Sequence, residues 1–402
     1  MKPKLTLLAA LVAGLLAILP SSIFAAANVR DYGAVGDGNA DDTAEIDAAI
    51  AASNAVYFPP GRYKYTNPNR MNLPGTKSYR LYGDGAGNSI IEFWGNPYNG
   101  ILMSSTQANP RTLTVEGLTL KAMTAGCGDA INAQFGDLSA DGAWKTRCLT
   151  VRNVQIQGTD RTGSPTGYWN HGMYLWQAMN SVIEDVQFEN KFQYGTGIYW
   201  GSSPSYGTTQ LFVNNVSLLY WAKAVKTDGH VEGFYMSNFE LVGVGTYYSY
   251  AMELEASGVS YSPVFHLTNG HLSFLGGGVR FHNLNSVKVA NVNFAHVGFA
   301  VGGGQGSGTH LYLDNVTNAS VTGSEFAGVP GIHYENGVYI GTGSEDVRVS
   351  GCLFSMAPAY GGSALVALSG VSRTRWLDNN FKGTINRYDN YSGSATFIRD
   401  IP

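Results

Sequence analysis

Two sets of charged residues recur at 27-residue steps in the middle of the chain. They are Lys226, Glu253 and Arg280 and, two residues after each, Asp228, Glu255 and His282. Paired carboxylates can cleave a glycosidic bond, one protonating the leaving oxygen while the other activates water or attacks carbon. Lysine or histidine can act instead as the base of an elimination. The pattern favours chemistry on a polysaccharide, with hydrolysis by the three acids ahead of elimination by a base.

Aromatic residues stand at the equivalent positions of neighbouring repeats. They are Tyr174, Trp176, Tyr199 and Tyr339. Apolar rings beside carboxylates suit a sugar-binding groove, because they can pack against the C–H surface of a pyranose. We expect these four residues to bind substrate. His171 is a further candidate base, at the end of the longest insertion between repeats, where Asp160 and Arg161 are expected to overhang the groove.

Each of these features has a structural alternative. Lys226, Glu253 and Arg280 would also form a surface salt-bridge ladder, in which each pair contributes about 0–1 kcal/mol. Exposed tyrosine is common on sheets because of its β propensity. A lone histidine such as His171 often serves packing or a turn.

Two interleaved repeats must position these residues. In the first, a small residue precedes an apolar one, at Ala130, Gly172, Gly197, Ala224, Ala251, Gly278, Ala300, Gly337 and Ala364. In the second, a turn-forming residue stands three before Leu, Ile or Phe, at Gly117, Asn153, Asp185, Asn215, Asn238, Asn269, Asn291, Gly323, Gly351 and Asp378. One shared period near 27 residues predicts a parallel β-helix in which each coil contributes at least two short strands. A propeller blade needs roughly 40–50 residues, so that alternative is disfavoured.

The domain organisation is predicted to be simple. Residues 1–27 combine Lys2 and Lys4 with an apolar run and a small-residue site, Ala25 to Ala27, which is typical of a cleaved secretory signal. Residues 28–402 are expected to form one β-helix domain, with no membrane span after cleavage. The protein is therefore predicted to be secreted or periplasmic.

Residues 28–63 are predicted to cap the N-terminal end of the coils. Asp42 and Glu45 have the spacing of a capping box, and Ile46, Ala49 and Ile50 form an apolar stripe. We expect a helix from Thr43 to about Ser53. Such a helix would cover the bare apolar end of the solenoid.

The segment NVRDYGAVGDGNADDTAEIDAAIAASNAVYFPPGRY, residues 28–63, resembles the start of the pectate lyase superfamily domain shared by rhamnogalacturonase-like proteins, alginate epimerase modules and phage tailspikes. The resemblance implies an all-β, single-stranded right-handed parallel β-helix of about ten coils with a short N-terminal capping helix. It also implies action on acidic or complex polysaccharides, without naming the reaction. The paired-aspartate and Gly-His-Gly strings of polygalacturonases, the Asp-Pro-His string of alginate epimerases and a convincing Arg-bearing pectate lyase signature are absent.

Composition narrows the partners. A net charge of −4 gives no basic footprint for nucleic acid, and Cys127, Cys148 and Cys352 show no metal-site spacing. A hydrolase would require no cofactor, whereas a lyase would need a cation such as Ca²⁺ to neutralise the substrate carboxylate. A polysaccharide-cleaving enzyme is favoured over a non-catalytic adhesion or tailspike-like β-helix, partly because of the signal segment. The oligomeric state and the pairing of the cysteines stay open.

Overall fold

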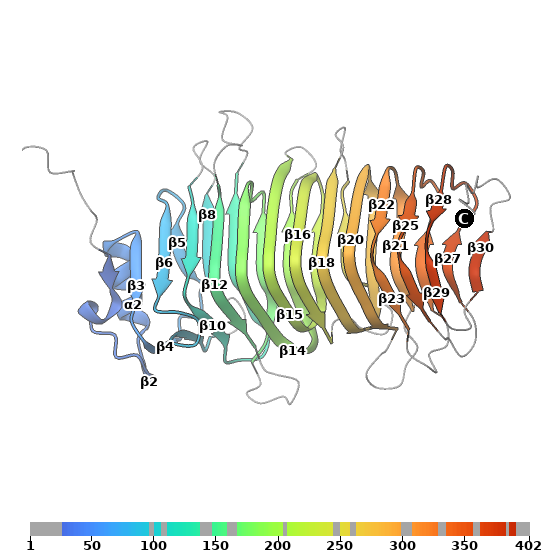
Figure 1. The fold of residues 1–402 in the computed structure, drawn as a ribbon. Coiled ribbons are helices and arrows are strands. Elements are labelled where there is room, and N and C mark those ends of the chain that lie inside the picture. The colour runs from blue at the N-terminus through green and yellow to red at the C-terminus, as the bar shows by residue number, and fades with distance from the viewer. Residues whose placement is uncertain are drawn as a thin grey trace, which may run out of the picture.

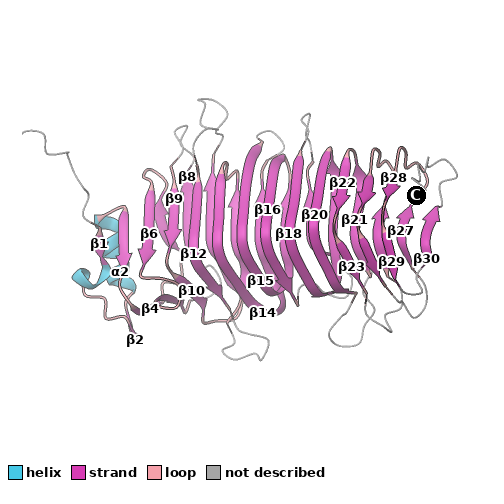
Figure 2. Ribbon diagram, viewed as in Figure 1, coloured by secondary structure: helices cyan, strands magenta, loops and turns pink. Residues whose placement is uncertain are grey.

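The chain forms a right-handed parallel β-helix of about ten turns, drawn in Figures 1 and 2 as one stack of strands. The structure is a computed structural model. It describes residues 26–95, 100–105, 111–136, 147–158, 167–203, 207–243, 250–257, 263–298, 308–328, 335–356, 362–382 and 386–390. All the strand pairings found among these residues are parallel, and they follow three series that we call the first, second and third sides.

The first side begins the coils. It comprises β1 (Ala27–Asn28), β3 (Ala55–Phe58), β6 (Tyr79–Gly83), β9 (Leu113–Glu116), the leading parts of β12 (Leu149–Gln157), β14 (Ser181–Gly201), β15 (Thr208–Asp228), β16 (Val231–Val242), β18 (Val264–Leu275) and β20 (Ser286–Val297), and β22 (Ala319–Thr322), β25 (Arg348–Ser350) and β28 (Arg375–Leu377).

The second side follows after one bend. It comprises β2 (Asp37–Asp41), β4 (Gly61–Tyr65), β7 (Ser89–Phe93), β10 (Thr119–Ala122), the following parts of β12, β14, β15, β16, β18 and β20, and β23 (Glu325–Ala327), β26 (Leu353–Ser355) and β29 (Asn380–Lys382).

The third side carries the candidate site. It comprises β5 (Met71–Pro74), β8 (Ile101–Ser105), β11 (Cys127–Phe135), β13 (Trp169–Trp176), the final parts of β14 and β15, and β17 (Tyr250–Glu255), β19 (Gly277–Leu284), β21 (Thr309–Val316), β24 (Asn336–Ile340), β27 (Ser363–Ala367) and β30 (Asn386–Asn390).

The bend between the first and second sides lies at the second sequence ladder. All ten of its residues, from Gly117 to Asp378, have positive φ, as the ladder of turn-forming residues predicts. Amide side chains join successive bends: Asn269 donates to Asn238, and Asn291 donates to Asn269, each at 3.4 Å. These bonds hold the corner of one coil above the corner of the next.

The first ladder lies where neighbouring backbones approach most closely. A Cβ atom on Gly278 would lie 1.8 Å from the carbonyl oxygen of His310, and one on Gly337 would lie 2.5 Å from that of Ala364. A Cβ atom is therefore excluded at these two glycines. Inside the coils, aromatic rings stack from one turn to the next; Phe294 and Phe326 have ring centroids 4.9 Å apart.

One member of the predicted first ladder is wrong. Ala300 lies outside the described residues, and the strand that pairs with Val279 on one side and Val338 on the other contains Leu311. The ladder position is thus held by His310, a large residue that the search for small residues could not find. The outward residues of this coil, paired in register with Arg280 and His282, are therefore Tyr312 and Asp314.

The N-terminal helix is present, as predicted, at the blue end of Figure 1. Helix α2 spans Thr43–Ala52, follows the short 3₁₀ helix η1 (Val29–Tyr32), and buries Ile46, Ala49 and Ile50. The predicted capping box is wrong, because Asp42 makes no side-chain capping bond. Its buried carboxylate instead accepts a hydrogen bond from the Val35 amide at 2.6 Å. The Asp42 carboxylate therefore binds the Val35 amide, which precedes the helix in the sequence, instead of an amide in the first turn of the helix.

The remaining expectations about the chain fall partly outside the structure. Most of the predicted signal segment, residues 1–25, lies outside the described residues. Within the part of the chain that the structure describes, no helix is long and apolar enough to cross a membrane. Cys127, Cys148 and Cys352 are all buried, and none of the three forms a disulfide in this structure.

Candidate active site

Outward residues of the third side fall into three columns. The central column is Asn132, Tyr174, Tyr199, Lys226, Glu253, Arg280, Tyr312 and Tyr339. Beside it stand Gln134, Trp176, Gly201 and Asp228, and farther along Glu255, His282 and Asp314. On its other flank are Asp129, His171, Thr196 and Lys223. The predicted register of Lys226, Glu253 and Arg280 is confirmed.

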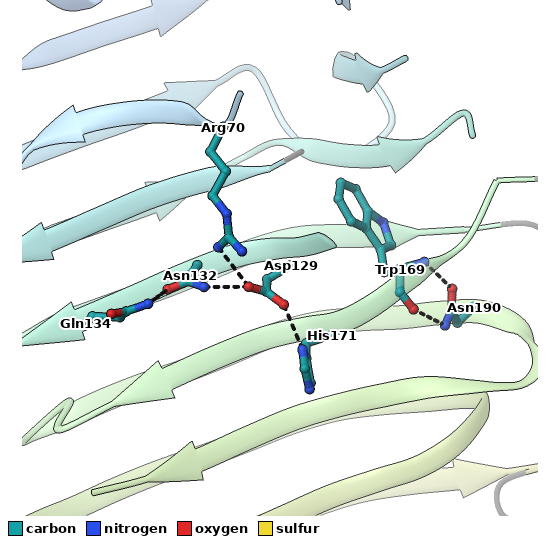
Figure 3. A network of polar contacts seen from close by, with 7 residues as sticks. All are labelled: Arg70, Asp129, Asn132, Gln134, Trp169, His171 and Asn190. Atoms are coloured by element: carbon teal, nitrogen blue, oxygen red, sulfur yellow. Dashed lines mark hydrogen bonds and ion pairs between the residues drawn. The ribbon is translucent and has the colours of Figure 1, made fainter. Parts of the chain in front are cut away.

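The most densely bonded group of the third side centres on Asp129 (Figure 3). Its carboxylate is 8% exposed and lies 2.8 Å from Nη1 of Arg70 and 2.7 Å from Nδ1 of His171. Asn132 also donates to it through Nδ2, and Gln134 in turn donates to the Asn132 oxygen at 2.8 Å. Arg70 comes from the turn before β5, which is separated from β11 by β8, so residues from three coils build the group.

Asp129 is ionised in this setting. Burial opposes ionisation, but the hydrogen bond and charge of His171, with the charge of Arg70 and the bond from Asn132, outweigh it and hold the pKa of Asp129 below its usual value. An ionised carboxylate only accepts hydrogen bonds. Nδ1 of His171 therefore carries the proton, and in the neutral ring Nε2 keeps a lone pair. A buried carboxylate that orients an imidazole in this way prepares a base.

His171 lies on strand β13 rather than in an overhanging loop, and it adjoins the tyrosines. Its ring centroid is 5.5 Å from that of Tyr174 and 5.9 Å from that of Tyr199. Tyr174 and Tyr199 stack at 4.9 Å with planes 3° apart, and Trp176 lies nearly parallel to Tyr174 at 6.4 Å. The loop residues Asp160 and Arg161 lie outside the described residues.

Tyr199 also contacts the charged end of the column. Its hydroxyl donates to Oδ2 of Asp228 at 3.3 Å. Burial, followed by the charge of Asp228, raises the pKa of Tyr199, and burial, followed by the charges of Asp129 and Asp228, raises that of Tyr174. Both phenols therefore hold their protons at neutral pH.

A bulge in strand β14 positions the start of strand β13, which carries His171. The register with β15 shifts between Glu189 and Tyr194, and the fully buried Asn190 sits in that interval. Its amide accepts from the Trp169 N–H and donates to the Trp169 carbonyl, each at 3.0 Å (Figure 3). Asn190 thereby anchors the start of β13, two residues before His171.

The charged residues farther along the column bind one another in an order different from the predicted ladder. Glu253 pairs with Lys223, not with Lys226 or Arg280. Arg280 pairs with Asp314, which also lies 2.9 Å from Nδ1 of His282. Tyr339, the last predicted sugar-binding residue, packs edge-on against Tyr312 at 5.1 Å.

Sequence reasoning missed Asp129, Arg70 and Asp314. Strict alternation assigns Asp129 no outward position, because Ala130 and Ile131 are both buried and interrupt the alternation. The same interruption at Gly172 and Met173 turns His171 outward. Asp129 and His171 each stand directly before a small residue of the first ladder, Ala130 and Gly172. This position was the signal in the sequence that could have identified them. Arg70 comes from a coil that lies before the first recognised repeat.

The side-chain chemistry around Asp129 does not match a cation site. Its two oxygens already accept from Arg70, His171 and Asn132, all nitrogen donors. Across the described ranges, no group of three or more His, Cys, Asp or Glu residues is arranged to hold a metal ion. No step is therefore assigned to Ca²⁺.

Comparisons with known proteins agree with this architecture. Mannuronan C5-epimerase AlgE1 of Azotobacter vinelandii is 29% identical over 204 residues, which are 47% of this chain and 13% of the epimerase. Alginate lyase 7 of the same organism is 31% identical over 104 residues, 23% of this chain and 12% of the lyase. The chain thus spans about an eighth of the length of these two relatives.

Among solved structures, the A-module of mannuronan C5-epimerase AlgE4 of Azotobacter vinelandii has the same fold. Its TM-score is 0.55 at 19% identity, covering 92% of this chain and 99% of the module. The family model described as rhamnogalacturonase A/epimerase, pectate lyase-like matches residues 26–242, more than half of the chain. The chain belongs to the rhamnogalacturonase A/epimerase, pectate lyase-like family.

Proposed function

We propose that this protein acts on a uronate-containing polysaccharide by removing the proton from C5 of a sugar ring, with His171 as the base. The observation that carries the proposal is the Asp129–His171 pair, in which a buried, ionised carboxylate lies 2.7 Å from Nδ1 of the imidazole. The similarity to a mannuronan epimerase and an alginate lyase supports the same class of substrate.

The first step is a proton transfer to Nε2 of His171. As the C5–H bond breaks, its electron pair moves toward the uronate carboxylate. The imidazolium that forms is stabilised by Asp129, whose carboxylate faces Nδ1. Positioned general-base catalysis of this kind contributes roughly 10²–10⁴-fold to a rate.

The second step needs an acid, and Tyr199 is the candidate. It keeps its phenolic proton, and its ring lies beside that of His171. Return of a proton to C5 from the opposite face would invert that centre. If the C4–O bond breaks instead, its electron pair leaves with the oxygen, which takes a proton, and a C4=C5 double bond forms. Epimerisation and elimination therefore share the first step.

A cation must face the substrate carboxylate, and Lys226 has the right place. It pairs in register with Tyr199, one rung beyond the stacked tyrosines, and no ion pair to it is found within the described ranges. Lys223 is unsuited because it already binds Glu253. Tyr174 and Trp176 would supply the apolar surface against which the sugar rings pack.

The test is solvent deuterium exchange at C5. Polymannuronate incubated with the protein in deuterated water should gain deuterium at C5, or lose that proton with formation of an unsaturated product, both followed by NMR. His171→Ala should abolish the signal. His271→Ala is the matched control, because His271 lies half-exposed on the second side, 3.8 Å from Glu240. If wild-type protein leaves C5 untouched in every polyuronate tried, the proposal fails.

Hydrolysis by paired carboxylates is the second candidate. Asp228 follows Gly201 in the column beside the tyrosines, and Glu255 pairs with His282. Because Tyr199 donates a hydrogen bond to Asp228, one of these acids lies next to the stacked rings of Tyr174 and Tyr199. A hydrolase would release reducing ends without unsaturation and without exchange at C5, which separates the two candidates in one experiment.

We further propose that the protein works outside the cytoplasm, as the signal-like residues 1–27 indicate. Binding without any chemistry would instead fit the adhesion or tailspike-like alternative. In that case polysaccharide would bind, and neither exchange nor reducing ends would appear.

A further inference from the structure

The first side carries a column of outward residues that the candidate active site does not use. It runs through Phe212, Tyr235, His266 and Lys288 and, after Ser320, through Arg348 and Arg375, with consecutive members paired in register. We call it the aromatic-basic column. It lies on a different side of the β-helix from Asp129 and His171.

The aromatic half of the column begins with an exposed ring and continues through two half-buried ones. Phe212 is 40% exposed and stacks on Tyr235, with centroids 5.1 Å apart and planes 13° apart. Tyr235 meets the ring of His266 edge-on at 5.2 Å. A phenylalanine left in water on a sheet face, continued by two more rings, provides apolar surface that folding alone does not use.

The other half of the column is positively charged. Lys288, Arg348 and Arg375 are exposed, and none of the ion pairs found within the described ranges involves them. Burial and the charge of Lys288 lower the pKa of His266, which shows that this charge reaches the aromatic half. The positive field is therefore continuous with the rings.

The outward column beside the aromatic-basic column contributes no carboxylate. The adjacent outward column on the first side reads Asn214, Ser237, Thr268, Ala290, Thr322, Ser350 and Leu377, without a charge. Glu345 and Asp346 lie near its basic end, and Arg373 binds both, at 2.9 and 2.7 Å. An anion approaching Lys288 meets no unpaired acid in these two columns.

We propose that the aromatic-basic column binds a second stretch of anionic polysaccharide, held apart from the stretch that reacts. Six strand spacings of about 4.8 Å make the column roughly 29 Å long, which suits an extended chain. Sugar rings would pack on the stacked rings of Phe212 and Tyr235, and their carboxylates would face Lys288, Arg348 and Arg375. The identity of the polyanion rests on the proposed function.

The experiment compares retardation of the full-length protein in gels containing sodium alginate or neutral dextran. Lys288→Gln/Arg348→Gln removes two charges from the column. Lys77→Gln/Lys382→Gln removes two exposed charges elsewhere and is the matched control. We expect the first pair to weaken alginate binding about three- to tenfold, more at low salt than at high salt, and the control to stay within about twofold. Tyr235→Ser should weaken it about fivefold.

Three results would overturn the proposal. The first is equal alginate retardation of the two double variants. The second is retardation of the wild-type protein in dextran gels as strong as in alginate gels, which would show that charge has no role in binding. The third is a dimer in sedimentation equilibrium that Phe212→Ser converts to monomer, which would make the column a contact between copies of the chain. Alginate retardation that depends on the column, without any exchange at C5, would refute the proposed function and leave this inference intact.

Discussion

Tyr174 and Tyr199 lie on successive coils with their rings 4.9 Å apart and only 3° from parallel. Strand pairing sets this spacing, because the two residues are direct partners in the β13–β14 register. Of the two, only Tyr199 donates a hydrogen bond to a carboxylate, that of Asp228. Two residues with the same ring are therefore expected to have different roles.

Replacing each tyrosine by phenylalanine should separate those roles. Tyr199→Phe keeps the stacked ring but loses the phenolic proton, so kcat should fall by roughly 10²–10⁴-fold with KM nearly unchanged. Tyr174→Phe should retain most of kcat. Steady-state kinetics on polymannuronate would measure both. Equal losses in the two variants would contradict the assignment of Tyr199 as the acid.

Asp129→Asn should disable His171 without removing it. The amide keeps the shape of the carboxylate but cannot accept from both Arg70 and His171 as an anion does, so the imidazole loses its fixed tautomer. We expect a loss of at least about 10²-fold in kcat. Circular dichroism should show the β-helix intact. Full activity in this folded variant would argue that His171 does not need its partner.

Glu255→Gln and Asp228→Asn distinguish proton abstraction from hydrolysis. If His171 is the base, Glu255→Gln should keep C5 exchange within a few-fold of wild type, because no contact links Glu255 to the Asp129 group within the described ranges. If paired carboxylates cleave the glycosidic bond, both variants should lose roughly 10²–10⁴-fold in release of reducing ends. Reducing-end assays and NMR on the same samples decide between them.

The N-terminal cap offers a test of stability. Asp42→Ala should lower the free energy of unfolding by about 1–3 kcal/mol, because it leaves the Val35 amide without its 2.6 Å acceptor. Glu45→Ala should be close to neutral, since the buried Oε2 of its carboxylate has no hydrogen-bond partner within the described residues. Urea unfolding of both variants would check this. A larger cost at Glu45 would restore the capping-box interpretation.

His310 predicts how stability depends on pH. The ring is fully buried beside the stacked rings of Phe294 and Phe326, its nitrogens have no hydrogen-bond partner within the described ranges, and burial lowers its pKa to about 3. The unfolded chain binds a proton here below about pH 6.5, whereas the folded protein does not. The free energy of unfolding should therefore fall as the pH drops from about 6.5 toward 3, by up to about 1.4 kcal/mol per pH unit.

His310→Phe isolates this contribution, because a phenylalanine ring can stack in the same place without titrating. The variant should lose about 2 kcal/mol less than wild type between pH 7 and pH 5 in urea unfolding. The lowered pKa of Asp129 acts in the same direction at lower pH and is common to both proteins. Identical pH profiles for the two would show that His310 is not responsible.

Much of the fold is readable from the sequence because it repeats. The ten bend residues from Gly117 to Asp378 announce the corner between the first and second sides through their tolerance of positive φ. The column of Lys226, Glu253 and Arg280 follows from uniform 27-residue steps. Periodicity failed at β21, where His310 occupies a position that the other coils give to glycine or alanine.

The site was less readable because its bonds join coils that the repeat does not link. Asp129 meets Arg70, 59 residues earlier, and His171, 42 residues later. Buried pairs such as Ala130 and Ile131 interrupt the alternation, and Arg70 lies in a turn before the first repeat, so alternation and spacing alone do not indicate these residues. The acids identified by spacing, Glu253 and Glu255, lie on β17, three strands beyond His171 along the third side.

The parallel register fixes the spacing of side chains along the axis of the β-helix. The Asp129–His171 pair and the Asp314–His282 pair stand on one side of the same stack, so their separation is quantised in steps of about 4.8 Å. Loops that differ in length between coils leave that scale unchanged, because they leave the stack at its corners. Gain or loss of one whole coil between the two pairs would lengthen or shorten the distance between them by one strand spacing. Gain or loss of a single strand residue would instead turn the following side chains of that strand to the opposite face.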